Sequence, residues 1–485
     1  MVRKSLFVLV AVLLAAIPLT AQTSWMKNYG GEGSETGWVV EQTTDGGYFV
    51  LGTTSSFGAG EADIWLLKTD SSGDTLWTKT YGGSLTEWAS SGQLTSDGGF
   101  IIAGYTESFG AGKYDIWLLK TDSSGDTVWT QTYGDTGYEE ANSVQRTTDG
   151  GYIITGYNNG VFNEEYGYVR PGDIWLIKTD DGGNLLWEKT YGTPEDEYEE
   201  GMCVRQTSDG GYIVGCYGLD DPATLSKARL MKTDASGDTV WIYRTSANRW
   251  FDCVEETSDG EYIIAGNFNI ADLGLAKISG TGSLLWEKTY GDPAPVNDWA
   301  NGLAETSDGG YIVTGLYAAL FPGGSPKNGD LWLLKTDENG DTLWTRTYGK
   351  NPQFDFGNCV RTTSDGGYIV TGITKSYTNG DYDLWLIKTD SLGFVETVQE
   401  EPIADAPADW QVLSPIGKRI VLRYEDRPQG FQATIFDASG RKVDEIHASQ
   451  ASGVITWGEN QTPGVYFIRS SSDNTMTTRK VILVK

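Results

Sequence analysis

Hydrophobic and polar residues repeat in the same order at intervals of about 50 residues through most of the chain. Each interval contains four short segments rich in β-branched and aromatic residues, which is the composition of β-strands. The first segment ends in a motif such as QTSD, the second reads GGYIVTG, the third DIWLLKTD and the fourth DTLWTKTYG. An Asp-Gly pair joins the first segment to the second at Asp45, Asp97, Asp149, Asp209, Asp259, Asp308 and Asp365.

Seven such units predict an all-β fold in which each unit is one four-stranded sheet. The Asp-Gly pair favours a two-residue hairpin turn between the first and second strands. A unit of this length repeated seven times is typical of a seven-bladed β-propeller, whose sheets stand in a ring. We therefore assign residues 22–395 to a propeller domain.

The ring is expected to close through the N-terminal strand. Six units carry a Trp in the fourth segment, and the seventh, which reads TDSLGFVETVQEE, has none. The motif that the seventh unit lacks occurs at the other end of the chain, as WMKNYGG around Trp25. Pairing this strand with the seventh unit removes two exposed sheet edges. In the alternative, Phe394–Val398 supplies the fourth strand of the seventh unit and Trp25 packs elsewhere.

Residues 1–21 resemble an export signal. Arg3 and Lys4 form a basic start, Leu6–Ile17 an apolar stretch, and Leu19-Thr20-Ala21 a cleavage site of small residues. The apolar stretch is too short to span a bilayer, and we expect no integral membrane segment elsewhere. No Cys follows the cleavage site, so no lipid anchor is expected there. The pattern predicts a secreted protein.

Charge and composition exclude several classes of function. The formal net charge of −30 disfavours nucleic acid and anionic membranes as partners, because both repel an acidic protein. The only His, His447, lies near the C-terminus, so the propeller has no His-based catalysis or zinc site of the usual kinds. We expect no resident cofactor or metal. Calcium at acidic turns is the exception considered, for the pairs Asp70 and Asp74, Asp122 and Asp126, and Asp337 and Asp341.

A row of acids at the start of the first strand is the candidate ligand-binding feature. Ten residues before each turn Asp stands an acid in six of the seven units: Glu35, Glu87, Glu139, Glu199, Asp298 and Asp355. The fifth unit has Arg249 there. The next residue is aromatic in four units, as Trp88, Trp250, Trp299 and Phe356. Acids beside aromatic rings suit sugars or cationic groups. In the alternative, the acids cap the strands and bind loop amides.

The loops favour the same end of the sheets as a binding face. Loops between the second and third strands vary from SFGAGEA to NNGVFNEEYGYVRPG, whereas the turns at the opposite end are regular. Variable loops on a rigid scaffold are typical of a binding surface. Paired carboxylates could also cleave a glycosidic bond, but catalysis needs two acids in unequal environments and no pair stands out.

Cysteine spacing points to one disulfide. None of the four cysteines forms a C-x-x-C motif. In the fourth unit Cys216 replaces a Gly found in the other six units, and a two-residue turn at Asp209-Gly210 brings it opposite Cys203. Opposed residues lie about 4.5–5.5 Å apart at Cβ, slightly wider than a disulfide prefers, and export to an oxidising compartment permits a bridge. Two buried free thiols are the alternative.

The turn between the third and fourth strands resembles two known propeller motifs. Asp70-Ser71-Ser72-Gly73-Asp74-Thr75-Leu76-Trp77 is similar to the Asp-box of sialidases and to the Trp-docking repeat of quinoproteins, with small differences in spacing. In both families the motif is architectural. The resemblance therefore implies a propeller and neither activity.

The C-terminal part resembles the type A sorting domain of the type IX secretion system. After an acidic, Pro-containing linker at 396–411, residues 412–485 carry the marks of that family. These are a D-x-x-G-R-x-V hairpin (Asp437, Gly440, Arg441, Val443), the motif PGVY (Pro463, Gly464, Val465, Tyr466) and a basic, apolar last strand ending at Lys485. Alternating strands of this number predict a small Ig-like β-sandwich. The resemblance implies export by the type IX secretion machinery.

Together these patterns predict a secreted or cell-surface, non-catalytic propeller that binds carbohydrate or protein through its loop face. The expected partners are a glycan or a surface protein and the secretion machinery, and we expect a monomer. A glycan-active hydrolase or lyase that uses loop-face carboxylates is a second hypothesis, and a structural surface-layer protein is a third.

Overall fold

The computed structural model describes residues 24–163, 168–192, 198–219, 227–245, 249–268, 272–291, 298–317, 329–350, 352–378 and 381–395, and in the C-terminal part 410–414, 416–417, 419–425, 427, 430–437, 442–458, 461–462, 464–472 and 475–483. The predicted export signal and residues 396–409 of the predicted linker lie outside the described residues. So do Gly440, Arg441, Pro463 and Lys485 of the sorting-domain motifs. The chain divides into two compact units between Thr397 and Val398.

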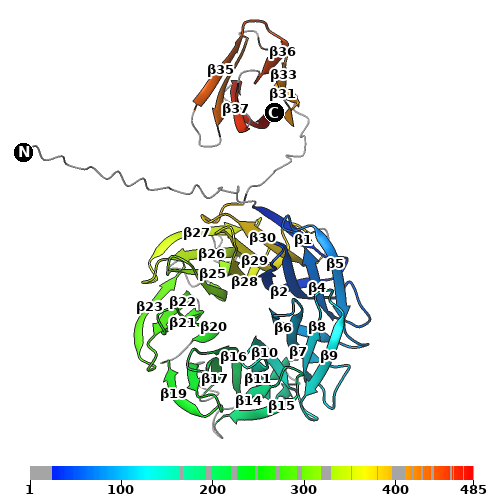
Figure 1. Ribbon diagram of the computed structural model, residues 1–485, viewed down its shortest axis with the longest axis vertical. Helices are drawn as coiled ribbons and strands as arrows, with labels where there is room; N and C mark the ends of the chain where they lie inside the picture. Colours follow the sequence, from blue (N-terminus) through cyan, green and yellow to red (C-terminus); the bar gives the residue numbers. More distant parts are fainter. Residues whose placement is uncertain are drawn as a thin grey trace, which may run out of the picture. The chain divides into compact units, whose positions relative to one another are not determined.

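The first unit is built from four-stranded antiparallel sheets, each with its first strand innermost (Figure 1). The first four sheets comprise β2 (Glu35–Gln42), β3 (Tyr48–Thr54), β4 (Asp63–Thr69) and β5 (Thr75–Tyr81); β6 (Glu87–Leu94), β7 (Phe100–Thr106), β8 (Asp115–Thr121) and β9 (Thr127–Tyr133); β10 (Glu140–Arg146), β11 (Tyr152–Asn158), β14 (Asp173–Thr179) and β15 (Leu185–Tyr191); and β16 (Tyr198–Gln206), β17 (Tyr212–Leu219), β18 (Lys227–Thr233) and β19 (Thr239–Arg244).

The remaining sheets complete the ring. They comprise β20 (Trp250–Glu256), β21 (Tyr262–Phe268), β22 (Asp272–Ile278) and β23 (Leu284–Tyr290); β24 (Trp299–Glu305), β25 (Tyr311–Tyr317), β26 (Asp330–Thr336) and β27 (Thr342–Tyr348); and β28 (Asp355–Thr362), β29 (Tyr368–Thr374), β30 (Asp383–Thr389) and β1 (Trp25–Tyr29). A small hairpin of β12 (Val161–Asn163) and β13 (Tyr168–Arg170) extends the loop between β11 and β14. We number these four-stranded sheets one to seven in this order and use the word blade as the label of one such sheet.

The N-terminal strand closes the last of these sheets. β1 pairs antiparallel with β30 from Trp25 opposite Lys388 to Tyr29 opposite Leu384, and Figure 1 shows this blue strand beside the yellow one. Each sheet contacts the next through its inner strands, and β29 of the last sheet contacts β2 of the first. The predicted pairing of Trp25 with the seventh unit is confirmed. The alternative is wrong in placing Trp25 elsewhere, and residues 396–398 of its strand lie outside the described residues.

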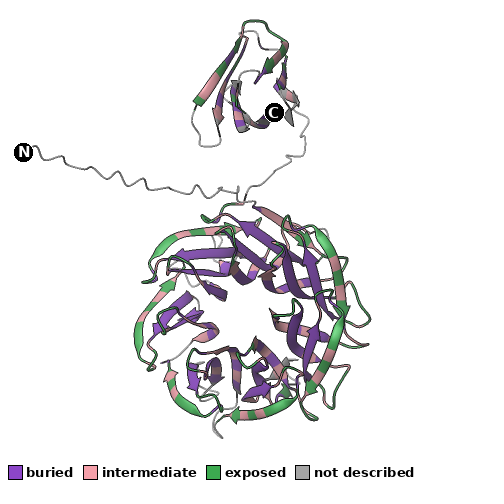
Figure 2. Cartoon of the chain, viewed as in Figure 1, coloured by how far each residue is buried: buried purple, intermediate pink, exposed green. Residues whose placement is uncertain are grey.

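Buried hydrophobic residues of the second and third strands fill the space between sheets, while the outer strands alternate between exposed and half-buried residues (Figure 2). A Trp in the third strand packs there in five sheets: Trp65, Trp117, Trp175, Trp332 and Trp385. Blade four has Arg229 instead, which forms an ion pair with Glu199. Blade five has Gly274, and the ring of Phe268 occupies the vacant space.

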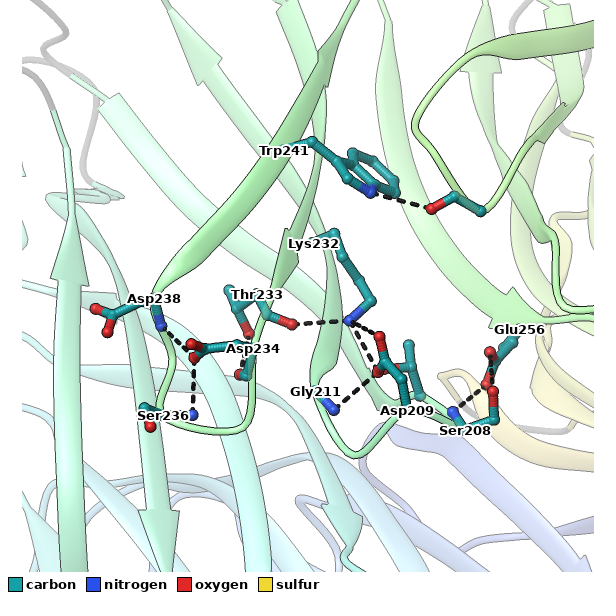
Figure 3. A network of polar contacts seen from close by, with 12 residues as sticks. Ser208, Asp209, Gly211, Lys232, Thr233, Asp234, Ser236, Asp238, Trp241 and Glu256 are labelled. Carbon is teal, nitrogen blue, oxygen red and sulfur yellow. Dashed lines mark hydrogen bonds and ion pairs between the residues drawn. The ribbon is translucent and has the colours of Figure 1, made fainter.

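An ion pair between the turn Asp and a buried Lys of the third strand holds every sheet together. The seven Lys residues are 1–9% exposed and lie 2.7 to 3.0 Å from their Asp partners. Figure 3 shows the pair of Asp209 and Lys232, whose ammonium also donates to the carbonyl of Thr233 at 2.8 Å. The repeated Lys and the repeated Asp are therefore two halves of one structural contact.

The fourth-strand Trp of each sheet packs on the Gly of the next sheet's outer turn. A Cβ added at that Gly would lie only 2.6 to 2.9 Å from the indole ring, for the pairs Trp25–Gly73, Trp77–Gly125, Trp129–Gly183, Trp187–Gly237, Trp241–Gly282, Trp286–Gly340 and Trp344–Gly393. Beside the first of these pairs, the hydroxyl of Tyr29 donates to the carbonyl of Gly73 at 2.5 Å. These contacts, which we call the Trp–Gly clamps, run round the whole ring and explain why the turn motif recurs.

The C-terminal unit consists of two sheets around one core. β31 (Trp410–Ser414), β33 (Ile420–Tyr424) and β36 (Gly453–Trp457) form the first sheet. β32 (Ile416–Gly417), β38 (Thr475–Leu483), β37 (Gly464–Ser472), β34 (Phe431–Asp437) and β35 (Lys442–Ala448) form the second. Trp410 and Trp457 of the first sheet share a hydrophobic cluster with Phe431 and Ile468 of the second. In the described part of the chain, no helix is long and apolar enough to cross a bilayer.

Candidate functional site at the loop-side end of the inner strands

The six acids predicted to face a ligand are buried where the inner strands begin. Each is at most 2% exposed: Glu35, Glu87, Glu139, Glu199, Asp298 and Asp355. The Glu35 carboxylate accepts hydrogen bonds from the amides of Gly31 and Ser56 and from the hydroxyl of Thr54, at 2.8 to 3.2 Å. Glu87 makes the equivalent contacts one sheet further on. These carboxylates therefore tie two loops to the inner strand.

At the equivalent positions of other blades, the charged side chain is likewise held by hydrogen bonds or an ion pair. Asp355 accepts from the Thr374 hydroxyl and from the amide of Ser376 at 3.2 Å. Burial raises the pKa of Glu139 to about 7, although the Asp135 amide hydrogen-bonds to it. In blade five the position holds Arg249, which pairs with Glu287 at 2.6 Å. The contacts fit the alternative interpretation, in which the acids cap the strands, and their role in ligand binding stays a prediction.

The residues that follow the six acids, together with Trp250, which follows Arg249, share one pattern of exposure. All seven are half-buried, whereas the next residue along every inner strand is buried. We call this set the mouth ring: Thr36, Trp88, Glu140, Glu200, Trp250, Trp299 and Phe356. Because it lies on the innermost strands at their loop-side end, it borders the centre of the ring (Figure 1). The four aromatic residues predicted from the sequence belong to it.

Aromatic side chains from neighbouring sheets contact one another within and beside the mouth ring. Trp88 lies 5.7 Å from Trp38, centroid to centroid, and Trp299 lies 6.1 Å from Phe356, edge to face. Trp250 packs 5.9 Å from Tyr217. These contacts hold each ring in place while part of its surface stays open, as in ligand sites that bind apolar faces.

Sequence reasoning missed three carboxyl groups next to these rings. Glu140 and Glu200 are members of the mouth ring, and Asp252 lies two residues beyond Trp250 on the same strand. Burial, together with the charge of Glu200, raises the pKa of Glu140 to about 8. Burial raises the pKa of Glu200 to about 7 against a hydrogen bond from Asn142, and that of Asp252 to about 7. The available signal was the doubled acid at 139–140 and 199–200.

A polar cavity of about 360 Å³ lies further along the same strands, toward their turn end. It is bordered by inner strands of six sheets, so it lies on the axis of the ring. Two cations, Arg205 and Arg361, and three acids, Glu41, Glu255 and Glu256, line it. Arg205 lies 4.0 Å from Glu255. Burial raises the pKa of Glu41, and the charge of Arg361 opposes that rise. These opposite charges partly neutralise one another, so the cavity offers both hydrogen-bond donors and acceptors.

The predicted disulfide between Cys203 and Cys216 is wrong, because the strand register differs from the one assumed. The hairpin pairs Thr207 with Gly211, leaving three residues in its loop, with Gly210 at a left-handed φ of 85°. This places Cys203 opposite Gly215 and, after a bulge, Cys216 opposite Gly201. A slip of one residue turns a side chain to the other face of the sheet. The two thiols accordingly sit in different hydrophobic clusters, and all four cysteines are free.

The acidic turns considered for calcium use their oxygens internally. Asp70 accepts from the amides of Ser72 and Asp74 at 2.9 and 2.8 Å, and Asp74 forms an ion pair with Lys27 of the neighbouring sheet. Across the residues that the structure describes, no group of three or more potential ligands is placed to hold a metal ion.

No family model and no curated protein matches the chain. Solved structures that resemble it include PorZ, an essential bacterial surface component of the type IX secretion system of Porphyromonas gingivalis, at 9% identity and a TM-score of 0.43. That match covers 92% of this chain and 59% of PorZ. The Pan2 WD40 domain of Neurospora crassa matches at 10% identity and a TM-score of 0.44, over 75% of this chain and 92% of that one. A chain of the COPII outer coat vertex matches at 10% and 0.47, over 86% and 99%.

Proposed function

We propose that this chain is an exported, non-catalytic, seven-bladed β-propeller that binds a glycan at the mouth ring. The seven sheets are its blades, and the C-terminal unit is an Ig-like sorting domain read by the type IX secretion machinery. The resemblance of the C-terminal motifs and the two-sheet arrangement of that unit support the second part. The protein is then secreted or held at the surface of a bacterium.

One observation carries the choice of ligand. Four half-buried aromatic rings occupy the loop-side end of the inner strands, next to acids that are already bound to loop amides. A sugar presents apolar C–H faces that stack on such rings, and hydroxyls that bind the nearby carboxyl groups. A protein ligand, the other class expected from the sequence, would bury roughly 800 Å² on each partner, whereas the mouth ring consists of seven side chains at the ends of the inner strands.

The carboxyl groups themselves argue against hydrolysis. Glycosidases need one acid that stays protonated and another that stays ionised. The pKa values of Glu140, Glu200 and Asp252 are all raised, to between about 7 and about 8, so all three are largely protonated under mildly acidic conditions. Protonated carboxyl groups donate and accept hydrogen bonds, which suits the recognition of hydroxyl groups.

A glycan array probed with the mature full-length chain tests this proposal. We expect binding to one class of glycan, and loss of at least tenfold in affinity for both Trp88→Ala and Trp299→Ala, since each removes one stacking surface. Phe394→Ala is the matched control, because its ring is 52% exposed but belongs to a turn at the opposite end of the sheets.

Two results would contradict the proposal. Binding that survives in both Trp variants would place the ligand elsewhere, and a folded chain that binds no glycan would overturn carbohydrate as the ligand class. Shortened products from a bound glycan would show catalysis and would replace the binding function by the hydrolase hypothesis.

A further inference from the structure

Blade four departs from the repeat at three residues that lie side by side on one face of its sheet. Arg229 stands where five other blades have the third-strand Trp. It lies opposite Cys216 on β17 and opposite Arg244 on β19. At the position of Cys216 the other six blades have Gly, and at that of Arg244 five of them have Thr. Because directly opposed residues share a face of the sheet, the three departures form one patch.

This face of blade four is turned toward blade three. The third-strand Trp of a blade packs on the third strand of the blade before it, as Trp332 does in sharing a hydrophobic cluster with Leu273. The residue of blade three that is equivalent to Leu273 is Ile174, and it shares a hydrophobic cluster with Cys216. The patch therefore lies between blades three and four, at the place that an indole ring takes in other blades.

The Arg229 side chain leaves a cavity of about 280 Å³ at this place, which we call the side cavity. In blade five, which also lacks the Trp, the ring of Phe268 fills the gap. Ile174, Met231 and Ile242 give the side cavity part of its lining. An apolar cavity of roughly 150 Å³ holds benzene, and sites for drug-sized ligands begin at about 300 Å³. The side cavity therefore suits one small molecule with one or two rings.

The lining carries a net positive charge, although the formal charge of the chain is −30. Its charged residues are Glu199, Arg229 and Arg244. Arg229 and Glu199 are both buried and form an ion pair. Arg244 is exposed and forms no ion pair within the described part of the chain. Burial raises the pKa of the Cys216 thiol, so this group stays uncharged. The guanidinium of Arg244 therefore attracts an anion.

We propose that the side cavity binds a small aromatic carboxylate. The guanidinium of Arg244 donates hydrogen bonds to both carboxylate oxygens, which its planar set of donors matches. The ring of the ligand takes the place of the missing indole, against Ile174 and Met231. An aromatic body follows from the shape of this place, because five other blades fit an indole ring there. The proposal is independent of the glycan, since Arg244 is on the outermost strand of its blade and the mouth ring is on the innermost strands.

Isothermal titration calorimetry of the full-length chain with benzoate, phenylacetate and indole-3-acetate tests the class of ligand. We expect at least one of the three to bind. The corresponding neutral amide should bind at least tenfold more weakly, because it lacks the charge that Arg244 recognises. A wild-type chain that binds none of the three carboxylates would overturn the proposal. Equal affinity for the acid and its amide would contradict the role of Arg244.

One single variant removes the charge of the side cavity and keeps its volume. Arg244→Thr introduces the residue that five other blades have at this position, and it should weaken binding at least tenfold. Arg146→Thr is the matched control, because Arg146 is likewise exposed but ends β10 at the opposite, turn end of blade three. Carboxylate binding that survives in Arg244→Thr, or is lost equally in both variants, would contradict the proposal.

A double variant removes the volume and keeps the charge of Arg244. Arg229→Trp with Cys216→Gly restores the pattern of the repeat, and the indole should fill the side cavity and abolish binding. We expect this chain to fold, because blade one combines Trp65 with Glu35 in the same way, and urea unfolding checks it. A folded double variant that still binds the carboxylate would place the ligand elsewhere.

The two proposed sites can be told apart in the same set of proteins. Arg244→Thr should bind a glycan as tightly as the wild-type chain does, because it leaves the mouth ring intact. A chain that binds no glycan leaves the titration with carboxylates unaffected, so the two proposals fail separately. Loss of glycan binding in Arg244→Thr would contradict the independence of the side cavity.

Discussion

At the scale of single residues, the chain uses its many carboxylates mainly as structural acceptors. The turn Asp of every blade binds a buried Lys, and the acids at the strand starts bind loop amides. The exceptions are the carboxyl groups near the axis, Glu140, Glu200 and Asp252, which lie close together with raised pKa values. The structural acceptors stabilise the fold when they are ionised, whereas Glu140, Glu200 and Asp252 stabilise it when they are protonated, so the two groups respond to pH in opposite directions.

We therefore predict that stability peaks near pH 5. The hydrogen bond from Thr43, with the Gly47 amide and Lys68, lowers the pKa of Asp45 to about 2, so its contribution is present above about pH 4 and is lost as the pH falls toward 2. The folded-state pKa of Glu140 is raised to about 8, so the native state binds more protons than the unfolded chain between about pH 4.5 and 8. Stability consequently falls as the pH rises through that window.

Urea unfolding from pH 3 to 9 measures this dependence. Glu200→Gln should flatten the decline in stability above pH 6, because the variant lacks one carboxyl group whose ionisation destabilises the folded state. A variant at an exposed carboxylate, Asp341→Asn, is the control for a general charge effect. A wild-type chain that gains stability steadily up to pH 9 would contradict the assignment of raised pKa values.

At the scale of elements, the outer turn is what joins one blade to the next. Gly125 has a left-handed φ of 76°, and a Cβ there would lie 2.6 Å from the ring of Trp77. Tyr81 donates to the carbonyl of Gly125 at 2.6 Å, and Lys79 pairs with Asp126 at 2.8 Å. One fourth strand therefore holds one turn of the next blade by an aromatic, a polar and an ionic contact.

Gly125→Ala and Gly150→Ala separate the clamp from backbone strain. Gly150 also has a left-handed φ, of 95°, but no atom lies within 4 Å of a Cβ added there. We expect about 1–2 kcal/mol of destabilisation for Gly150→Ala from the strained conformation alone. Gly125→Ala should cost about 2–4 kcal/mol, because the methyl group also displaces Trp77. Equal losses in urea unfolding would show that the clamp contributes nothing.

Repetition made the elements of this chain predictable, and local deviations from it did not. The four strands of each blade and the pairing of Trp25 with the seventh sheet follow from counting repeats. The hairpin at Asp209 does not, because Asp-Gly suits both two- and three-residue loops. A two-residue type I′ turn needs a positive φ at Asp209 as well as at Gly210, and only Gly210 has one, so the longer loop forms. The buried state of Glu35 is likewise invisible in sequence, since exposed and buried acids at a strand start look alike.

At the scale of the whole molecule, seven sheets act as one ring and the C-terminal unit stands on its own core. Every interface of the ring repeats the Trp–Gly clamp, and the interface between the last and first sheets uses Trp25 on Gly73. A ring in which every sheet has two neighbours has no end from which unfolding starts. Closure by a strand from the other end of the chain therefore links the stability of all the blades.

Removal of the closing strand should weaken the entire ring. Deletion of residues 23–31 takes away the pairing of β1 with β30 and the clamp on Gly73, so we expect the first unit to lose several kcal/mol and to unfold in a broader transition. Trp25→Ala, which keeps the backbone pairing, should lose about 2 kcal/mol, and Trp25→Phe less, because part of the ring contact remains.

Differential scanning calorimetry resolves the two units, and the transition of the C-terminal unit is the internal reference, since its core contains no residue of β1. A deletion variant whose first-unit transition keeps the wild-type midpoint would mean that β30 is stable as an edge strand and that closure contributes little.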